Sequence, residues 1–234
     1  AAFTGITTHT GTMTISGTTA ATEAELLVIN AATAGAITLN AQTIAANYSE
    51  SAANLVLMFD GTITEHTGVL TISGATAATV AELVAINAAT TGTPVLNAAT
   101  NAANFSDTAA NLTAGFLGTT SHTGTLTVTG AAATVAQANL LDAITQGVVT
   151  ATIEGDSAAD LATLTGTTGV YTVVQNGTVV ATIAELIAIN AATTGGITIN
   201  SNTIANNYSD TAANLVAAFT GITTHTGTMT ISGT

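Results

Sequence analysis

The stretch AAFTGITTHTGTMTISGT, residues 1–18, recurs letter for letter as residues 217–234. Eighteen consecutive identities do not arise by chance, so the chain contains one full period of a 216-residue repeat and the start of the next. A fixed internal period is the sequence signature of a repeat architecture, and it decides the fold class before any local pattern is read.

A shorter repeat lies inside this period. An aromatic residue or Leu, followed two positions later by Gly, recurs at Phe3, Phe59, Phe116, Leu164 and Phe219. The chain therefore divides into units 3–58, 59–115, 116–163 and 164–218, and residues 219–234 restart the repeat. Each unit contains two similar halves, which gives eight half-units of about 27 residues.

The first kind of half-unit is predicted to form a strand and then a helix. In the strand at 11–17, Met13 and Ile15 alternate with Thr and Ser, which is the period of a strand with one apolar face. Its counterparts are 68–74, 124–130 and 169–174. The helices open with T-x-x-E or T-x-x-Q, which predicts capping boxes that begin at Thr22, Thr79, Thr134 and Thr182.

These helices should bury one face, and three of them should end at the same type of residue, Asn. Apolar residues three apart share a face, and the pairs are Leu26 with Ile29, Leu83 with Ile86, and Leu186 with Ile189. Asn tolerates the left-handed backbone that commonly closes a helix. The helices are therefore predicted to end at Asn30, Asn87 and Asn190.

The second kind of half-unit begins with the predicted strands 35–40, 95–97 and 196–200. Helices follow at 49–55, 106–112 and 209–215, with a degenerate copy at 156–161. Ser or Asp is expected to cap each helix start. Pro94, the only proline, stands at a strand start, where a missing N–H donor is tolerated.

A helix between successive strands requires parallel pairing, and strand and helix at a fixed short period are typical of a solenoid. The sequence therefore predicts an α/β repeat solenoid, single and continuous over residues 1–234. A parallel sheet forms one side and short helices the other, in about eight coils per period. The segment 147–168 is short and irregular, which predicts a local defect there.

The composition excludes several classes of function. The chain has no Lys and no Arg, and 13 acidic residues give a net charge of −13. Without cationic side chains it is not expected to bind nucleic acid or an anionic membrane surface. The chain contains no stretch of about 18 continuous apolar residues, which a membrane-spanning helix would need. The absence of Cys excludes disulfides and thiol chemistry.

The four histidines, His9, His66, His122 and His225, each stand in H-T-G before a predicted strand. They recur every second half-unit, about 10 Å apart at the strand spacing, so they cannot share one metal ion. We interpret them as turn residues that bond to the backbone.

The acidic residues fall mostly into two columns. Glu25, Glu82 and Glu185 belong to capping boxes, whereas Glu50, Asp107, Asp156 and Asp210 are expected in the first turns of helices, where the helix dipole favours them. A row of calcium sites along the second column stays an open alternative, although no D-x-D cluster supplies several oxygens locally.

The sequence contains no arrangement typical of a catalytic site. Ser121 and His122 are adjacent but have no nearby orienting acid, and the irregular segment carries Glu154, Asp156 and Asp160 but no His. The prediction is that the chain is not an enzyme and has no catalytic, cofactor or metal residues.

Outward Thr side chains suggest another function. The predicted strands align Thr14, Thr38, Thr71, Thr127, Thr172 and Thr198 in one row, interrupted by Val95. Flat Thr rows on β-solenoids resemble ice-binding surfaces, so ice binding is an alternative. Thr is also simply a favourable strand residue.

The words SDTAANL (106–112 and 209–215) and TVAELVAIN (79–87) resemble repeats of giant bacterial cell-surface proteins. The resemblance covers nearly the whole chain. It implies export by type I secretion and a role as adhesin, surface-layer component or matrix fibre. The nonapeptide GGxGxD, which often binds calcium in such proteins, is absent.

The expected function is structural: an extracellular segment of a filament, surface layer or adhesin stalk that associates with itself along the solenoid axis. Bare strand edges at the ends of a solenoid favour such association. The alternatives are ice binding and a ligand-binding adhesin module, with host or cell-surface glycans as candidate partners and 147–168 as the candidate surface.

Overall fold

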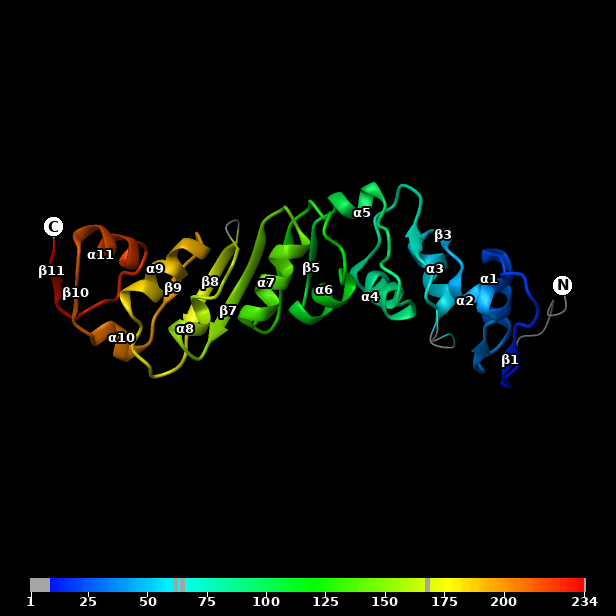
Figure 1. Ribbon diagram of the computed structural model, residues 1–234, viewed down its shortest axis with the longest axis horizontal. Coiled ribbons are helices and arrows are strands. Elements are labelled where there is room, and N and C mark those ends of the chain that lie inside the picture. Colours follow the sequence, from blue (N-terminus) through cyan, green and yellow to red (C-terminus); the bar gives the residue numbers. More distant parts are fainter. Residues whose placement is uncertain (1–8, 61–62, 64–65, 167–168, 234) are drawn as a thin grey trace. The chain divides into compact units, whose positions relative to one another are not determined.

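The structure is a computed structural model that describes residues 9–60, 63, 66–166 and 169–233 (Figure 1). The chain forms two compact units, one up to Ala103 together with Ala114–His122, the other of Asn104–Thr113 and Thr123–Thr234. The predictions that concern residues 1–8, 61, 167–168 and 234 lie outside the described residues.

Short strands and helices alternate in the first unit. Its elements are β1 (Met13–Thr14), α1 (Glu23–Ala32), β2 (Ile37–Thr38), α2 (Ala41–Ala45), β3 (Tyr48–Glu50), α3 (Ala52–Phe59), β4 (Leu70–Ile72), α4 (Val80–Ala89) and α5 (Ala98–Ala102). β1 pairs in parallel with β2, and β3 pairs in parallel with β4. Val95 extends the second pair through a parallel bridge to Thr71.

The second unit has the larger sheet. Its elements are β5 (Phe105–Asp107), β6 (Leu126–Val128), α7 (Val135–Ile144), β7 (Val149–Gly155), α8 (Ala158–Leu161), β8 (Val170–Gln175), α9 (Ile183–Ala192), β9 (Ile197–Thr198), α10 (Ser201–Ala205), β10 (Tyr208–Asp210), α11 (Ala212–Phe219) and β11 (Met229–Ile231); α6 (Ala109–Gly115) has residues in both units.

Five strands of this unit, β5 to β9, form one parallel sheet in chain order, and β10 pairs in parallel with β11. The helices α7, α8 and α9 each join one strand of the sheet to the next, and Figure 1 shows this alternation along the chain. The predicted α/β class and parallel pairing are confirmed. The strands are parallel because a helical crossover lets the next strand run in the same direction.

The predicted single continuous sheet is wrong: the described strands fall into four separate sheets. The three divisions follow the five-residue helices α2, α5 and α10, which begin directly after Asn40, Asn97 and Asn200. Each Asn side chain accepts a bond at 2.8 Å from the N–H of the Thr three residues on, and thereby starts a helix. The strand that follows each short helix, β3, β5 or β10, then pairs with a later strand.

The four predicted capping boxes are confirmed at the starts of α1, α4, α7 and α9. In each, the Thr hydroxyl accepts a bond from the third helical N–H, and the Glu or Gln side chain accepts one from the N–H of that Thr. The predicted apolar face is buried as well, except that Ile29 is partly exposed.

The predicted ends of these helices are wrong. Asn30, Asn87 and Asn190 lie inside helices that continue to Ala32, Ala89 and Ala192. A Thr in extended backbone follows each helix, and its hydroxyl accepts the N–H of a Gly two residues on, at 2.9–3.0 Å. Because this hydroxyl takes up the turn's N–H, a left-handed residue is not needed, and no described non-glycine residue has positive φ.

The second predicted helix begins later than expected. Ser49 and Glu50 belong to β3, and α3 begins at Ala52 with Ser51 as its N-cap. Likewise Asp210 lies in β10, and Thr211 caps α11. The reason is the buried Tyr48, which pairs with Leu70 across the sheet and holds the residues after it in a strand.

The prediction of a local defect at 147–168 is wrong for the sheet, which is regular there. This segment contains β7, the longest described strand, which pairs with β8 over six residues from Thr150 to Gly155. Val149, Ala151 and Ile153 are buried and alternate with exposed residues, a strand signal that the repeat alignment obscured. The helix of this segment, α8, is short, as its degenerate sequence predicted.

Candidate functional site

The recurring polar residues mostly connect one half-unit to the next. Thr43, Thr100 and Thr203 are buried, and each Oγ1 accepts the backbone N–H of an Ala 22 residues earlier, at 2.9–3.0 Å. These Ala residues are Ala21, Ala78 and Ala181. The hydroxyls therefore satisfy backbone groups that would otherwise be buried without a partner.

The Asn residues inside the long helices have the same kind of role. The Nδ2 of Asn190 donates to the carbonyl of Ala218 in α11 at 2.7 Å, and Asn139 donates to Thr163 at 2.9 Å. Asn30 and Asn87 donate in the same way to Leu57 and Gly115. Each amide occupies a carbonyl near the end of another helix, where intrahelical partners run out.

Three of the four histidines bond to the backbone, as predicted. The Nε2 atoms of His66, His122 and His225 lie 2.9–3.0 Å from the carbonyls of Ala46, Ala103 and Asn206. A carbonyl only accepts, so Nε2 carries the proton in each. His9 differs, since its Nδ1 lies 3.1 Å from the hydroxyl of Thr33.

The imidazoles pack among aromatic rings. The ring centre of His66 lies 4.7 Å from that of Phe59, and the centre of His122 lies 4.8 Å from that of Phe116. Burial lowers the pKa of both imidazoles, and the bonds to the carbonyls oppose this effect only in part. Both are therefore neutral parts of the core at pH 7.

The two columns of acids are used locally. Glu25, Glu82 and Glu185 belong to the capping boxes, and the bonds from the backbone and hydroxyl of Thr22 lower the pKa of Glu25. The prediction that Glu50, Asp107 and Asp210 lie in the first turns of helices is wrong. They lie at the ends of strands. Their carboxylates accept the N–H of the next residue and the Nδ2 of an Asn four residues on, at 2.7–3.2 Å. Asp156 is exposed and precedes Ser157, the N-cap of α8.

The residues considered for metal binding or catalysis do not converge. Among the described residues, no three His, Asp or Glu side chains lie close enough to hold a metal ion. The Oγ of Ser121 lies 3.4 Å from Oδ1 of Asn101, while Nε2 of His122 is engaged with Ala103. In the irregular segment, Glu154 accepts a bond from Asn176 at 3.1 Å, and Asp160 lies in α8.

The predicted row of Thr side chains is wrong in the second unit. Thr127 pairs with Thr150, and Thr150 pairs with Val170. Thr172 pairs instead with Thr152, and Thr198 pairs with Val174. The long strands β7 and β8 shift the register, so Thr127, Thr172 and Thr198 belong to three different rows. In the first unit Thr14 does pair with Thr38, and Thr71 with Val95.

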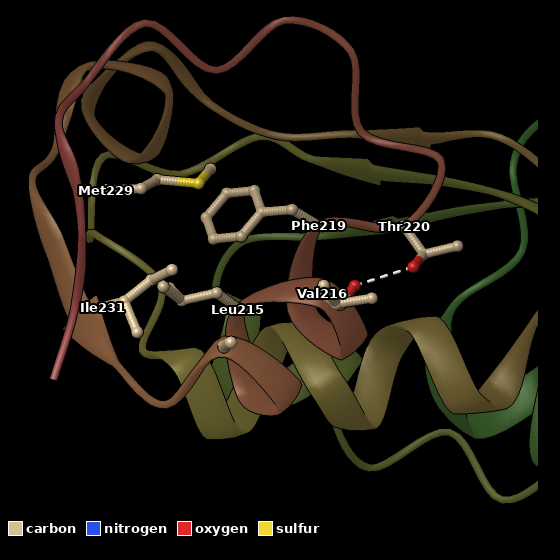
Figure 2. Close-up of a pocket in the computed structure, with 7 residues that line it drawn as sticks. Leu215, Val216, Phe219, Thr220, Met229 and Ile231 are labelled. Atoms are coloured by element: carbon tan, nitrogen blue, oxygen red, sulfur yellow. Dashed lines mark hydrogen bonds between the residues drawn. The ribbon is translucent and has the colours of Figure 1, made fainter. Parts of the chain in front are cut away.

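An apolar cavity of about 460 Å³ lies at the C-terminal end of the second unit. Figure 2 shows Leu215, Val216 and Phe219 of α11 on one side and Met229 and Ile231 of β11 on the other. The only hydrogen bond drawn there joins the Thr220 hydroxyl to the Val216 carbonyl at 2.7 Å, within the chain's own turn. Sequence reasoning missed this site. No sequence signal distinguishes it, since Met229 and Ile231 follow the same apolar pattern as Leu70 and Ile72 of β4.

No family model matches the chain, and comparisons with curated proteins and with solved structures find no significant match. In the described part of the chain, no helix is both long and apolar enough to cross a membrane.

Proposed function

We propose that this chain is a structural segment of an extracellular bacterial filament, surface layer or adhesin stalk. In this proposal the strand and helix units continue as one α/β solenoid of about eight coils per 216-residue period. The chain associates with itself along the solenoid axis, and the fold itself is the working part, without catalysis, cofactor or metal.

The observation that carries this proposal is the use of the recurring polar residues. The buried Thr hydroxyls, the helix Asn amides and three of the histidines all bond to backbone groups 19 to 28 residues away in the chain. The residues that recur are thus the residues that join one half-unit to the next. Selection that keeps such residues maintains an architecture, whereas a binding or catalytic site needs polar groups that converge on a ligand.

The sheet order supports the solenoid. Strands β5 to β9 follow one another in the sheet in the order of the chain, with one helix per crossover in most steps. In a solenoid each unit contacts only its neighbours, and this order is the result. Separate sheets in a solenoid mean that short helices such as α2 interrupt the strand stack at fixed places.

The charge agrees with self-association without loss of solubility. A net charge of −13 without cations favours the solubility of an apolar, self-complementary chain and gives no attraction to nucleic acid. The extracellular location rests on the resemblance to type-I-secreted surface proteins.

Cryo-electron microscopy of the native material tests the proposal. We expect long filaments or a lattice with a strong repeat of about 4.8 Å along the axis, which is the spacing of stacked parallel strands. Discrete short particles at all concentrations would contradict assembly as the function.

A further inference from the structure

We propose that Asn47, Asn104 and Asn207 are acceptor sites for N-linked sugars, which are attached to the folded chain. Each of them begins the pattern Asn-x-Ser, which is the acceptor pattern for sugar transfer to asparagine. The wider pattern Asn-x-Ser/Thr also occurs at Asn111 and Asn176, and the structure separates these two from the other three. The proposal assigns a surface modification and holds whether or not the chain assembles into filaments.

The three proposed sites share one backbone arrangement. Each Asn stands directly before a strand, β3, β5 or β10, and the Ser is the second residue of that strand. The residue between them, Tyr48, Phe105 or Tyr208, is buried, whereas the Asn and the Ser are exposed. In extended backbone, residues two apart lie on the same side. A transferase can therefore reach the amide and the hydroxyl from one side of the molecule.

The chain holds the oxygen of each amide and leaves the nitrogen unbound. Oδ1 accepts the backbone N–H of Val69, Thr125 or Thr228, at 2.8–2.9 Å. Since a backbone N–H only donates, the atom that faces it is the oxygen, and Nδ2 is the other end of the amide. In the described part of the chain, Nδ2 of these three residues has no hydrogen-bond partner. The atom that would take the sugar is thus unengaged, in a side chain that is both exposed and oriented.

The fold accounts for the Asn oxygen but not for the Ser hydroxyl. The carboxylate of an Asp could accept the same backbone N–H, so this bond alone does not require an amide. The hydroxyls of Ser49 and Ser106 have no hydrogen-bond partner among the described residues, and that of Ser209 bonds only to the hydroxyl of Ser232, at 3.0 Å. An amide followed two residues later by an exposed hydroxyl is what recognition by a transferase requires.

Asn111 has the acceptor pattern but lies in a helix, α6. Its Nδ2 donates to Oδ1 of Asp107 at 2.8 Å, and the hydroxyl of Thr113 donates to the carbonyl of Ala109 at 2.8 Å. Residues two apart on a helix do not face the same way. Both polar groups of this pattern are therefore engaged and point apart, so we expect no sugar at Asn111.

Asn176 is also engaged by the fold. Its Nδ2 donates to Oε2 of Glu154 at 3.1 Å, and the carbonyl of Thr178 accepts a bond from Asn202 at 2.6 Å. Gly177 lies so close to the backbone of Asp156 that a methyl group on it would overlap the Asp156 carbonyl. The segment cannot move toward a transferase without losing these contacts, so we expect no sugar at Asn176.

The transfer needs an activated sugar and a transferase, and this chain supplies only the acceptor. Nδ2 attacks the anomeric carbon of a sugar diphosphate ester. A C–N bond forms, the C–O bond to the diphosphate breaks, and its electron pair leaves with the diphosphate. One Nδ2 proton passes to a base of the transferase and the other stays on the amide, so nothing is oxidised or reduced. Oδ1 keeps its hydrogen bond to the backbone, and the modification leaves the fold intact.

Mass spectrometry of the native chain tests the sites. Cleavage after Asp and Glu places the five candidate residues in five different peptides. The proposed sites fall in peptides 26–50, 83–107 and 186–210, whereas Asn111 and Asn176 fall in 108–142 and 161–185. We expect a sugar on the first three peptides and none on the other two. Unmodified Asn47, Asn104 and Asn207 would overturn the proposal. Asn111 modified to the same extent as Asn104 would overturn it too, because the folded structure would then not select the sites.

Two variants at Ser106, made in the source organism, test recognition of the pattern. S106A should lose the sugar at Asn104 and keep those at Asn47 and Asn207, since the hydrogen bond of Asn104 does not involve Ser106. S106T keeps the hydroxyl and should keep the sugar. Unchanged circular dichroism would show that S106A still folds, and a sugar retained at Asn104 in S106A would contradict the proposal. The size of the glycan identifies the donor: a single sugar fits a nucleotide-activated donor and an oligosaccharide a lipid-linked one, and either supports the assigned sites.

Discussion

The Nε2 atom of His66 donates a hydrogen bond of 2.9 Å to the carbonyl oxygen of Ala46, 20 residues earlier in the chain. The other ring nitrogen, Nδ1, is buried and has no partner in the described structure. A protonated imidazole would need a partner for both nitrogens, so this site stabilises the neutral ring.

This geometry predicts acid-sensitive stability. Burial lowers the pKa of His66 and of His122 in the folded chain. The unfolded chain then binds more protons than the folded one below about pH 6.5, so the free energy of unfolding falls as the pH drops through that value. Urea unfolding at pH 7.5 and pH 5.5 measures this loss.

Substitutions of single histidines test which imidazoles cause the loss of stability at low pH. H66Q and H122Q cannot be protonated, so each should reduce the difference in stability between pH 7.5 and pH 5.5, even if it lowers stability at both. His9 is less buried and bonds to a hydroxyl, and H9Q serves as the matched control. An unchanged pH dependence in H66Q/H122Q would contradict the prediction.

The sequence predicted those structural features that depend on residues close together in the chain. The capping box of Thr79 and Glu82 was readable because its two partners stand three residues apart. The role of Asn87 was not, because its partner, the carbonyl of Gly115, is 28 residues away. A five-residue helix such as α2 is too short for a hydrophobic period, so the break that Asn40 introduces into the sheet was also invisible.

The candidate site was hidden for a different reason. The pattern of Met229 and Ile231 is that of an ordinary core strand, and only the structure shows that these side chains are uncovered. The Thr row failed because the six-residue pairing of β7 with β8 shifts the register, and a shift of this kind moves side chains relative to every later strand.

The buried Thr hydroxyls should be essential to stability. In T100V a methyl group replaces the hydroxyl that accepts the N–H of Ala78 at 2.9 Å, and this N–H is left buried without a partner. We expect a loss of about 1–3 kcal/mol in the free energy of unfolding, measured by urea denaturation. T100S keeps the acceptor and should lose clearly less. A loss in T100S without a loss in T100V would show that the methyl group of Thr100, not its hydroxyl, matters.

The buried tyrosines should respond differently to loss of the hydroxyl. The Tyr208 hydroxyl donates to the carbonyl of Ala181 at 2.8 Å, so Y208F should destabilise the chain by about 1 kcal/mol. The Tyr171 hydroxyl is buried with no partner in the described structure, so Y171F should be neutral or stabilising at pH 7.

Y171F should also change how the free energy of unfolding depends on pH above pH 10. Burial, and to a lesser extent the charge of Asp142, raises the pKa of Tyr171 to about 12. Above pH 10 the unfolded chain releases this proton while the folded chain keeps it, so the stability of the wild type falls between pH 10 and pH 12. Y171F should lose less stability over that interval. A wild-type slope in Y171F would mean that Tyr48 and Tyr208, whose pKa values are also raised by burial, account for the effect.

Two adjacent glycines, Gly195 and Gly196, should differ sharply in their tolerance of Ala. A methyl group on Gly195 would overlap the backbone carbonyl of Tyr171, whereas one on Gly196 would meet no atom within 4 Å. Neither residue has a left-handed backbone, so the contact alone separates them. G195A should force the chain between α9 and β9 away from β8 and destabilise the fold by about 1–3 kcal/mol. G196A should be neutral or add about 0.4–1 kcal/mol, because Ala restricts the unfolded chain. Thermal unfolding of both variants measures the difference, and equal melting temperatures would contradict the close approach of Gly195 to Tyr171.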